Sequence, residues 1–316
     1  MDIVLLFPGQ GSQKPGMGRD VAEAYPAARA VFDRVDMALG TPLSELAFEG
    51  PAEELTLTHN AQPALLAHSA AIWAVVHPAL DGLVRAAAGH SLGEFTAYHA
   101  AGALDVVDAA RLVRRRGELM LRAGEERPGA MAALLGDPAR PIEDICEEAS
   151  REAGLVVPAN YNSPTQLVIS GEVAGVERAS ELAKAHGVKK TVRLHVSGAF
   201  HSPLMAPAQR GLRQALDAAD FVEAELPVYA NVNAEPVTAP ARARDLLEQQ
   251  LVAPVRWVDV IRALAEAHPE ALFVEMGPGA VLMHLVKKIA PHVHTATCGT
   301  AAEVEALLER AAAART

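Results

Sequence analysis

The sequence predicts an α/β protein in which a large domain with a parallel β-sheet carries a smaller inserted domain. The run Ile3–Phe7 is continuously apolar, which is typical of a strand buried on both faces of a parallel sheet. A second short apolar run leads into Gly-His-Ser-Leu-Gly at residues 89–93 and then into a helix-forming stretch. Residues 127–197 show a different order of strands and helices, which indicates a separate unit within the chain.

Length and composition place the chain among globular proteins and narrow the partners and sites to expect. The 316 residues can bury the core of one large domain or two; half of them are hydrophobic and 21% are charged. The formal net charge of −11 argues against nucleic acid as a partner. Only two cysteines are present, Cys146 and Cys298, so we expect neither a metal cluster nor a disulfide framework.

No signal or membrane segment is apparent, so we expect a cytoplasmic protein without a membrane partner. The N-terminus has no basic region, and its apolar run is too short for a signal peptide. The most apolar window, residues 61–76, contains Gln62, Pro63, His68 and Ser69, which disfavours a membrane span. The sequence is compatible with a monomer but does not fix the oligomeric state.

The first strand ends in a glycine-rich loop, Pro-Gly-Gln-Gly-Ser-Gln at residues 8–13. In α/β proteins ligands bind at loops that follow the carboxyl ends of central strands, although such a loop can also be a plain turn. This loop lacks the further glycine of a dinucleotide fingerprint, so we expect no nucleotide cofactor there. Apolar residues at helical spacing then predict helices at residues 20–39, 60–76 and 104–123.

The middle of the chain predicts a small ferredoxin-like domain at residues 127–197. Strands are expected at residues 130–135, 155–160, 166–170 and 188–196, with helices at 141–153 and 173–186. This order, β-α-β-β-α-β, is that of a ferredoxin-like unit. The large domain then comprises residues 1–126 and 198–316. Its second part is predicted to hold strands at 228–232 and 272–276 and helices at 209–219, 245–252, 258–267, 281–289 and 301–313.

Ser91 lies where the second apolar run turns into a helix, and this position suits a nucleophile. A serine at a sharp strand-to-helix turn projects from the backbone, and glycines two residues to either side let strand and helix approach closely. The helix N-terminus behind it offers N–H groups and a positive dipole end to an oxyanion. The pattern predicts a hydrolase-like α/β fold; the alternative is a glycine-rich turn without chemistry.

A serine nucleophile needs a base, and His201 is the best placed of the 12 histidines. It lies between Gly198 and Pro203, directly after the inserted domain, where a cleft between the two domains is expected. His90 is adjacent to Ser91 but is expected to point away from it and to have a structural role. The other histidines lie in helical or polar surroundings.

Several motifs along the whole chain resemble the malonyl-CoA:acyl carrier protein transacylases, which are similar to the acyltransferase domains of polyketide synthases. The resemblance rests on four stretches: Gly9-Gln10-Gly11-Ser12-Gln13, Gly89-His90-Ser91-Leu92-Gly93-Glu94, Gly198-Ala199-Phe200-His201-Ser202 and Gly277-Pro278-Gly279. Segments at residues 50–55, 62–65, 160–164 and 250–255 also resemble the family. Motifs in this order are far more specific together than any one of them alone.

The resemblance implies a ping-pong acyl transfer without a metal or an organic cofactor. Ser91 would form a malonyl ester with His201 as general base, and the phosphopantetheine thiol of acyl carrier protein would then accept the malonyl group. In the family a main-chain carbonyl orients the histidine, which carries over to Gln250. The oxyanion hole would consist of the backbone N–H groups of Leu92 and Gln10.

The resemblance also implies three substrate contacts. The family's arginine maps to Arg116, and a guanidinium can bind the malonyl carboxylate through two parallel hydrogen bonds. Phe200 is predicted to fill the space that a methyl group on C2 would need, and so to favour malonyl over methylmalonyl. The alternative is that Phe200 only packs near the loop that contains it. Asn162, within one of the resembling segments, is the third predicted contact.

Malonyl-CoA and acyl carrier protein are the implied partners. Carrier proteins are acidic, so a locally basic docking face is expected despite the net negative charge. The candidates are Lys189, Lys190, Arg193, Lys287 and Lys288, each of which is otherwise a solvated surface charge.

Two other functions remain alternatives. A serine hydrolase such as a thioesterase shares Ser91 and His201, but it needs neither the arginine at 116 nor the Gln10 loop. A catalytically silent module that docks carrier protein has no use for both Ser91 and His201. The motifs do not separate fatty-acid from polyketide synthesis, because discrete enzymes of both pathways look alike.

Overall fold

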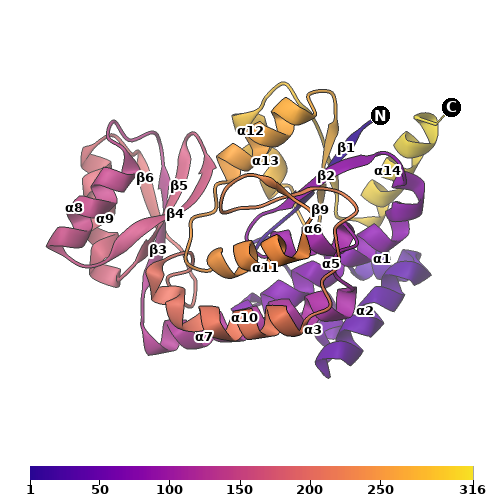
Figure 1. Ribbon diagram of the computed structural model, residues 1–316, viewed down its shortest axis with the longest axis horizontal. Helices are drawn as coiled ribbons and strands as arrows, with labels where there is room; N and C mark the ends of the chain where they lie inside the picture. The colour runs from indigo at the N-terminus through magenta and orange to yellow at the C-terminus, as the bar shows by residue number, and fades with distance from the viewer. Residues whose placement is uncertain (316) are drawn as a thin grey trace.

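The computed structural model describes residues 1–315, and its main sheet has six strands in the order β10-β9-β1-β2-β7-β8 (Figure 1). The strands are β1 (Ile3–Phe7), β2 (Val84–Gly89), β7 (Val228–Tyr229), β8 (Pro236–Val237), β9 (Leu272–Met276) and β10 (His294–Cys298). Neighbouring strands pair in parallel except β7 and β8, which are antiparallel. The predicted parallel-sheet core is confirmed.

Helices surround this sheet (Figure 1). Before the second sheet the chain forms α1 (Arg19–Ala24), α2 (Pro26–Leu39), α3 (Leu43–Glu49), α4 (Ala52–Thr56), α5 (Thr58–Leu80), α6 (Gly93–Ala100) and α7 (Val106–Glu126). After it follow the short 3₁₀ helix η1 (Pro203–Met205), α10 (Ala206–Ala218), α11 (Pro240–Gln249), α12 (Trp257–Ala267), α13 (Val281–Ile289) and α14 (Ala301–Ala313).

The central strand β1 contributes to two hydrophobic cores, one on each face of the sheet. Ile3, Leu5 and Phe7 pack into a core that includes residues of α5 and α7, whereas Val4 and Leu6 pack into a core with α12 and α13. All five side chains are fully buried. Because side chains alternate between the faces of a strand, a strand covered on both sides must be apolar throughout.

Helix α5 is the only helix among the described residues that is long and apolar enough to cross a membrane. Within its most apolar window, 72% of the residues are buried inside the protein. The helix packs against α2 and α7. Such burial is typical of the core helix of a globular protein.

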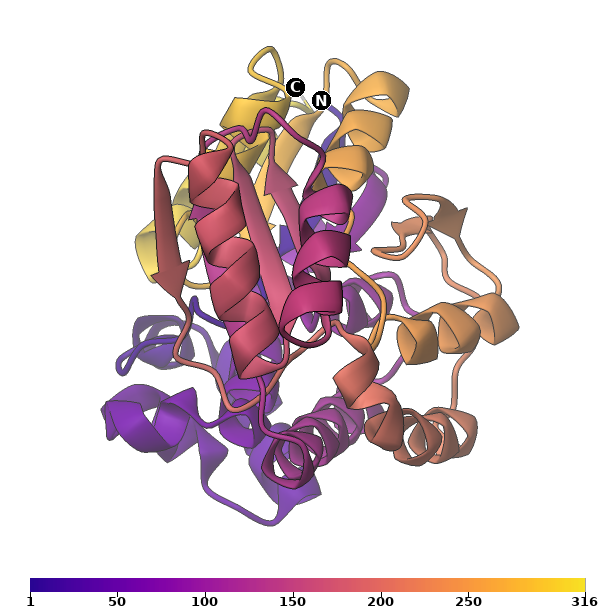
Figure 2. The ribbon, with the colours of Figure 1, turned by 90° about the vertical axis from the view of Figure 1, so that its left-hand side faces the viewer.

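The second sheet is antiparallel, with strands in the order β4-β5-β3-β6. In chain order, the strands of this sheet and the helices between them are β3 (Ala130–Leu135), α8 (Ile142–Glu152), β4 (Val156–Ser163), β5 (Gln166–Gly171), α9 (Val173–Ala185) and β6 (Lys190–Arg193). Helices α8 and α9 lie side by side on one face of this sheet and share a core with it (Figure 2). This is the predicted ferredoxin-like order; the domain boundaries at residues 127 and 197 stay a prediction.

The elements differ from the prediction where local signals conflict with sequence periodicity. The helix predicted at residues 20–39 is two helices, because Tyr25 is extended (φ −128°, ψ 113°) in front of Pro26. The strands predicted at 188–196 and 228–232 are shorter and comprise only Lys190–Arg193 and Val228–Tyr229. Strand β10 was not predicted, because its sequence, His-Thr-Ala-Thr-Cys, is largely polar and forms a strand through pairing with β9.

Candidate active site

A cavity of about 350 Å³ lies where the carboxyl ends of β1 and β2 face the second sheet. Met131 of β3 and Val168 of β5 contribute apolar side chains to it. Seven of the eight predicted site residues line the cavity: Gln10, Ser91, Leu92, Arg116, Asn162, Phe200 and His201. The eighth, Gln250, is fully buried and reaches this group through hydrogen bonds.

Ser91 is held in a sharp turn between β2 and α6. Its φ of 52° lies in the left-handed region, which a non-glycine residue rarely adopts. A Cβ on Gly89 would lie 1.9 Å from the Gly93 backbone, and one on Gly93 would lie 2.1 Å from the Phe7 carbonyl oxygen. Only glycine allows such close approach of strand, helix and the neighbouring strand, so the turn has the geometry of a nucleophile elbow.

Ser91 and His201 form a hydrogen-bonded pair. The Ser91 Oγ lies 2.8 Å from His201 Nε2, and His201 Nδ1 lies 2.8 Å from the backbone carbonyl oxygen of Gln250. A carbonyl can only accept, so Nδ1 carries the proton and Nε2 is free to accept the proton of the serine hydroxyl. The carbonyl thus orients the imidazole, a task that a carboxylate performs in serine proteases.

The electrostatic environment keeps His201 neutral. Burial, reinforced by the positive charge of Arg116, lowers the pKa of His201 to about 3. The neutral imidazole is the form that can act as a base toward Ser91 at physiological pH.

Arg116 is a buried cation directed at the nucleophile. Its side chain is 1% exposed, and its Nη2 donates to Ser91 Oγ at 3.0 Å and to Gln250 Oε1 at 2.9 Å. Its Nη1 donates to Gln62 Oε1 at 2.8 Å, and the guanidinium lies 5.6 Å from the ring centre of Phe95. Burial lowers the pKa of Arg116 to about 10, so the group remains charged at neutral pH.

Two backbone N–H groups beside Ser91 are available to an oxyanion. Among residues 1–315 the N–H groups of Gln10 and Leu92 have no protein acceptor, and both residues line the cavity. Gln10 is held by a hydrogen bond from Thr58 Oγ1 to its side-chain oxygen at 2.8 Å. A Cβ on Gly9 would lie 2.5 Å from the backbone oxygen of the residue before Ser91, which shows how closely the two loops approach.

The remaining predicted contacts lie at the cavity wall. Phe200 is 6% exposed and lines the cavity next to His201. The side-chain oxygen of Asn162 lies 2.8 Å from His90 Nε2, so part of its hydrogen-bonding capacity is used within the protein. His90 also packs near Trp257, with ring centres 5.4 Å apart.

The sequence did not assign roles to three buried polar residues that hold the site together. Gln62 binds Arg116, Glu94 binds Gln250, and Asn231 accepts the Ser91 backbone N–H at 2.7 Å. Gln62 and Glu94 lie in family-like stretches, which was the only available signal. The sequence predicts Asn231 within the strand at residues 228–232, and nothing local to it indicates a contact with Ser91.

No group of three or more His, Cys, Asp or Glu side chains that could hold a metal ion occurs within residues 1–315. The polar groups that surround Ser91 Oγ are instead an imidazole and a guanidinium.

Comparison with known proteins identifies relatives along nearly the whole chain. The acyl transferase domain profile matches residues 4–309. The malonyl CoA-acyl carrier protein transacylase of Bacillus subtilis (strain 168) is 46% identical over 294 residues, which cover 93% of this chain and 92% of the relative. That of Escherichia coli (strain K12) is 41% identical over 307 residues, 97% of this chain and 99% of the relative.

Solved structures agree with these relatives. The acyl-carrier-protein-S-malonyltransferase of Bartonella henselae superposes with a TM-score of 0.93 at 43% identity and covers 99% of this chain and 100% of that one. A malonyl-transacylase solved in complex with a type II polyketide synthase acyl-carrier protein superposes with a TM-score of 0.93 at 38% identity, and the match covers 98% of this chain and 100% of that one. The chain therefore belongs to the acyl transferase domain family and, within it, to the malonyl CoA-acyl carrier protein transacylases.

Proposed function

We propose that this protein transfers the malonyl group from malonyl-CoA to the phosphopantetheine thiol of acyl carrier protein. The observation that carries the proposal is the buried Arg116 guanidinium, 3.0 Å from the Ser91 hydroxyl oxygen. An acyl group bound to Ser91 that carries its own carboxylate can pair with this cation. A neutral acyl group would leave the buried guanidinium with only neutral hydrogen-bond partners, which is unfavourable.

In the first half-reaction the Ser91 hydroxyl attacks the thioester carbonyl carbon and its proton passes to His201 Nε2. The oxygen of the tetrahedral intermediate becomes negative and accepts hydrogen bonds from the Leu92 and Gln10 N–H groups. The carbon–sulfur bond then breaks, the coenzyme A sulfur takes the proton from His201, and malonyl-Ser91 remains.

The second half-reaction is the reverse with a different thiol. The phosphopantetheine thiol gives its proton to His201 and attacks the ester, and Ser91 leaves with that proton. Burial is the larger cause of the lowered pKa of His201 and the Arg116 charge the second, and a malonyl carboxylate paired with Arg116 would offset that second cause. Neutralising the guanidinium would remove its repulsion of the imidazolium that forms when His201 takes the serine proton.

We infer a cytoplasmic enzyme that needs no metal or organic cofactor and that holds the substrate between a large domain, residues 1–126 and 198–316, and a small one, residues 127–197. Phe200 and Asn162 would contact the malonyl group, and Gln250 would orient His201 through its carbonyl. Met131 and Val168 would give the bound acyl chain an apolar wall on the side of the second sheet.

The test is to incubate the protein with malonyl-CoA and to look for a malonyl adduct by mass spectrometry, with Ser91→Ala as control. Acyl carrier protein is then added, and loss of the adduct with gain of malonyl carrier protein is the expected result. An adduct that water removes rapidly would indicate a thioesterase. No adduct on a folded protein would indicate a docking module.

A further inference from the structure

The nucleophile helix α6 carries a buried carboxylate, Glu94, that the proposed reaction does not use. The side chain is 0% exposed. Its Oε2 accepts the backbone N–H of Asn231 at 3.0 Å and a side-chain N–H of Gln250 at 2.7 Å. Its Oε1 has no partner among the described residues. One carboxylate oxygen thus joins α6, the turn after β7 and the end of α11.

Asn231, which Glu94 holds, in turn binds the backbone at the nucleophile. Its side-chain oxygen accepts the Ser91 N–H at 2.7 Å, and its side-chain nitrogen donates to the Gly89 carbonyl at 2.8 Å. The two bonds hold the backbone on either side of His90, where Ser91 adopts its left-handed conformation. A strained turn persists only where the surroundings fix it.

Gln250, which Glu94 also holds, binds Ser91, Arg116 and His201. The side-chain nitrogen that binds Glu94 also donates to the Ser91 carbonyl oxygen at 3.1 Å. Its side-chain oxygen accepts from Arg116 at 2.9 Å, and its backbone carbonyl accepts from His201 at 2.8 Å. If the amide were free to rotate, both Arg116 and the elbow would lose a fixed partner.

We propose that Glu94 is a positioning residue whose Oε2 fixes Gln250 and Asn231 and thereby sets the geometry of Ser91 and Arg116. This inference rests on the proposed function. Both donors need an acceptor oxygen rather than a negative charge, so an amide oxygen at the same place can replace the carboxylate. A protonated carboxyl group also keeps one such oxygen, which matters because burial raises the pKa of Glu94 to about 7.

The experiment compares Glu94→Gln, which keeps an acceptor, with Glu94→Met, which keeps the length of the side chain but has no good acceptor. The rate of Ser91 acylation by malonyl-CoA, kcat, KM and Tm are measured for each. We expect kcat to fall by about 10- to 100-fold in Glu94→Met and to stay within about threefold of wild type in Glu94→Gln. Such rescue by the amide separates positioning from a purely structural role.

The matched control is Glu275→Met, because Glu275 is also 0% exposed and accepts two backbone N–H groups, from Leu282 and Met283 at 3.1 and 2.9 Å. It caps α13 and contacts no group of the site. We expect this variant to lower Tm but to leave kcat close to that of the wild type.

A double-mutant cycle with Gln250→Met tests the route of the effect. If Glu94 acts through Gln250, the combined loss of kcat is smaller than the product of the two single losses. Should Glu94→Met not fold, Glu94→Asp, which withdraws the carboxylate by one methylene, takes its place with the same expectation.

The outcomes separate the two proposals. Wild-type protein that forms no malonyl-Ser91 overturns the proposed function. If the wild-type protein is acylated and Glu94→Met is acylated at the same rate, only the role of Glu94 is overturned. That role is also overturned if Glu94→Gln is as slow as Glu94→Met. It is overturned as well if the loss of kcat in the double variant equals the product of the losses in Glu94→Met and Gln250→Met.

Discussion

At the scale of single residues, the nucleophile and the base share an uncommon backbone conformation. Ser91 has φ of 52° and His201 has φ of 56°; within residues 1–315 only Ala234 joins them among non-glycine residues with positive φ. Such conformations cost on the order of 1–3 kcal/mol each. At Ser91 the backbone N–H donates to the Asn231 side chain and the carbonyl oxygen accepts from the Gln250 side chain, so groups far away in sequence hold the strained turn.

Arg116→Lys should separate charge from geometry. Lysine keeps the positive charge but cannot hold Gln62, Ser91 and Gln250 together or bind a carboxylate through two parallel bonds. We expect kcat/KM for malonyl-CoA to fall about 10- to 100-fold, with a much smaller loss for acetyl-CoA. Steady-state kinetics with both thioesters measures this. Equal losses would contradict a role in carboxylate recognition.

Phe200→Ser tests the selectivity of the cavity. The ring of Phe200 lines the cavity beside His201, and its removal opens space for a methyl group on C2. We expect the ratio of kcat/KM for malonyl-CoA to that for methylmalonyl-CoA to fall about tenfold. The two substrates are compared in competition in the same tube. An unchanged ratio would assign Phe200 to packing alone.

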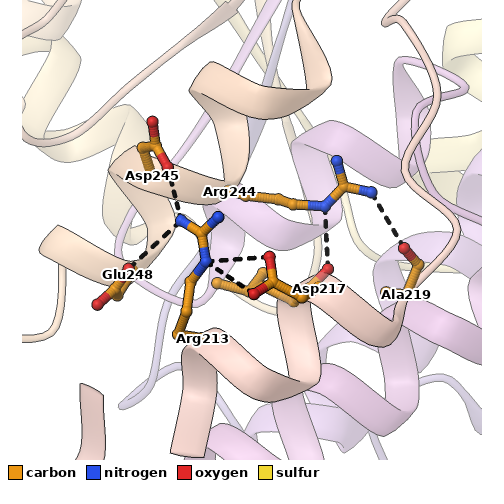
Figure 3. Close-up of polar contacts among 7 residues, drawn as sticks. Arg213, Asp217, Ala219, Arg244, Asp245 and Glu248 are labelled. Atoms are coloured by element: carbon orange, nitrogen blue, oxygen red, sulfur yellow. Dashed lines mark hydrogen bonds and ion pairs between the residues drawn. The ribbon is translucent and has the colours of Figure 1, made fainter. Parts of the chain in front are cut away.

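At the scale of elements, a cluster of ion pairs joins the two helices beside the base. Helix α10 begins shortly after His201, and Gln250 caps the end of α11. On these helices Arg213 contacts Asp217, Asp245 and Glu248 at 3.0, 2.6 and 3.5 Å, and Arg244 donates to the carbonyls of Leu216 and Ala219 (Figure 3). The cluster therefore links α10 and α11 near the two residues of the His201–Gln250 hydrogen bond.

Arg213→Gln should loosen this junction. We expect kcat to fall by about two- to fivefold, because the His201–Gln250 hydrogen bond is then less well fixed. Arg178→Gln is the matched control, since the Arg178 side chain binds two carboxylates, has the same 37% exposure as that of Arg213, and lies on α9. Both variants should lower Tm by similar small amounts, whereas only Arg213→Gln should lower kcat. Equal kcat values would show that the junction is purely structural.

At the scale of the whole molecule, buried histidines couple stability to pH. Burial lowers the pKa of His68 to about 4 and that of His201 to about 3. In the unfolded chain both would bind protons below about pH 6.5, so stability is lost as pH falls from 6.5 toward these values. Glu94, whose pKa burial raises to about 7, acts in the opposite direction.

His68→Gln isolates one of these contributions. The amide can replace the imidazole that bonds to the Gly299 carbonyl at 3.0 Å, and it does not titrate. The free energy of unfolding of each protein is compared with its own value at pH 8. Between pH 6.5 and 4.5 it should fall less steeply in the variant than in wild type, with slopes that differ by up to about 1.4 kcal/mol per pH unit. Urea unfolding at a series of pH values measures this. Parallel pH profiles would show that His68 is not held neutral by the fold.

The surface of the molecule predicts how transfer depends on salt. Lys189, Lys190, Lys287 and Lys288 are exposed and form no ion pair within the described chain, whereas Arg193 pairs with Glu177 at 3.4 Å. If an acidic carrier protein docks on unpaired lysines, kcat/KM for carrier protein should fall severalfold as salt rises, while acylation by malonyl-CoA changes less. Transfer that does not respond to salt would argue against electrostatic docking.

Much of the architecture could be predicted, because it depends on periodicity. The apolar run of β1, the elbow at Ser91 and the order of elements in the second sheet all follow from patterns of neighbouring residues. The failures have two causes: Pro26 locally divides a stretch with helical periodicity, and β10 becomes a strand only through pairing with β9. Local sequence does not contain the partner strand.

The sequence by itself determined the family and the fold class and predicted eight site residues, seven of which line the cavity, because motifs and periodicity are properties of neighbours in the chain. Only the tertiary structure decided how those residues are joined. The contacts from Glu94 to Gln250 and Asn231, and from Arg116 to Gln62, link residues separated by 54 to 156 positions. Hydrogen bonds depend on distance and direction in space, and no pattern in a single sequence specifies these.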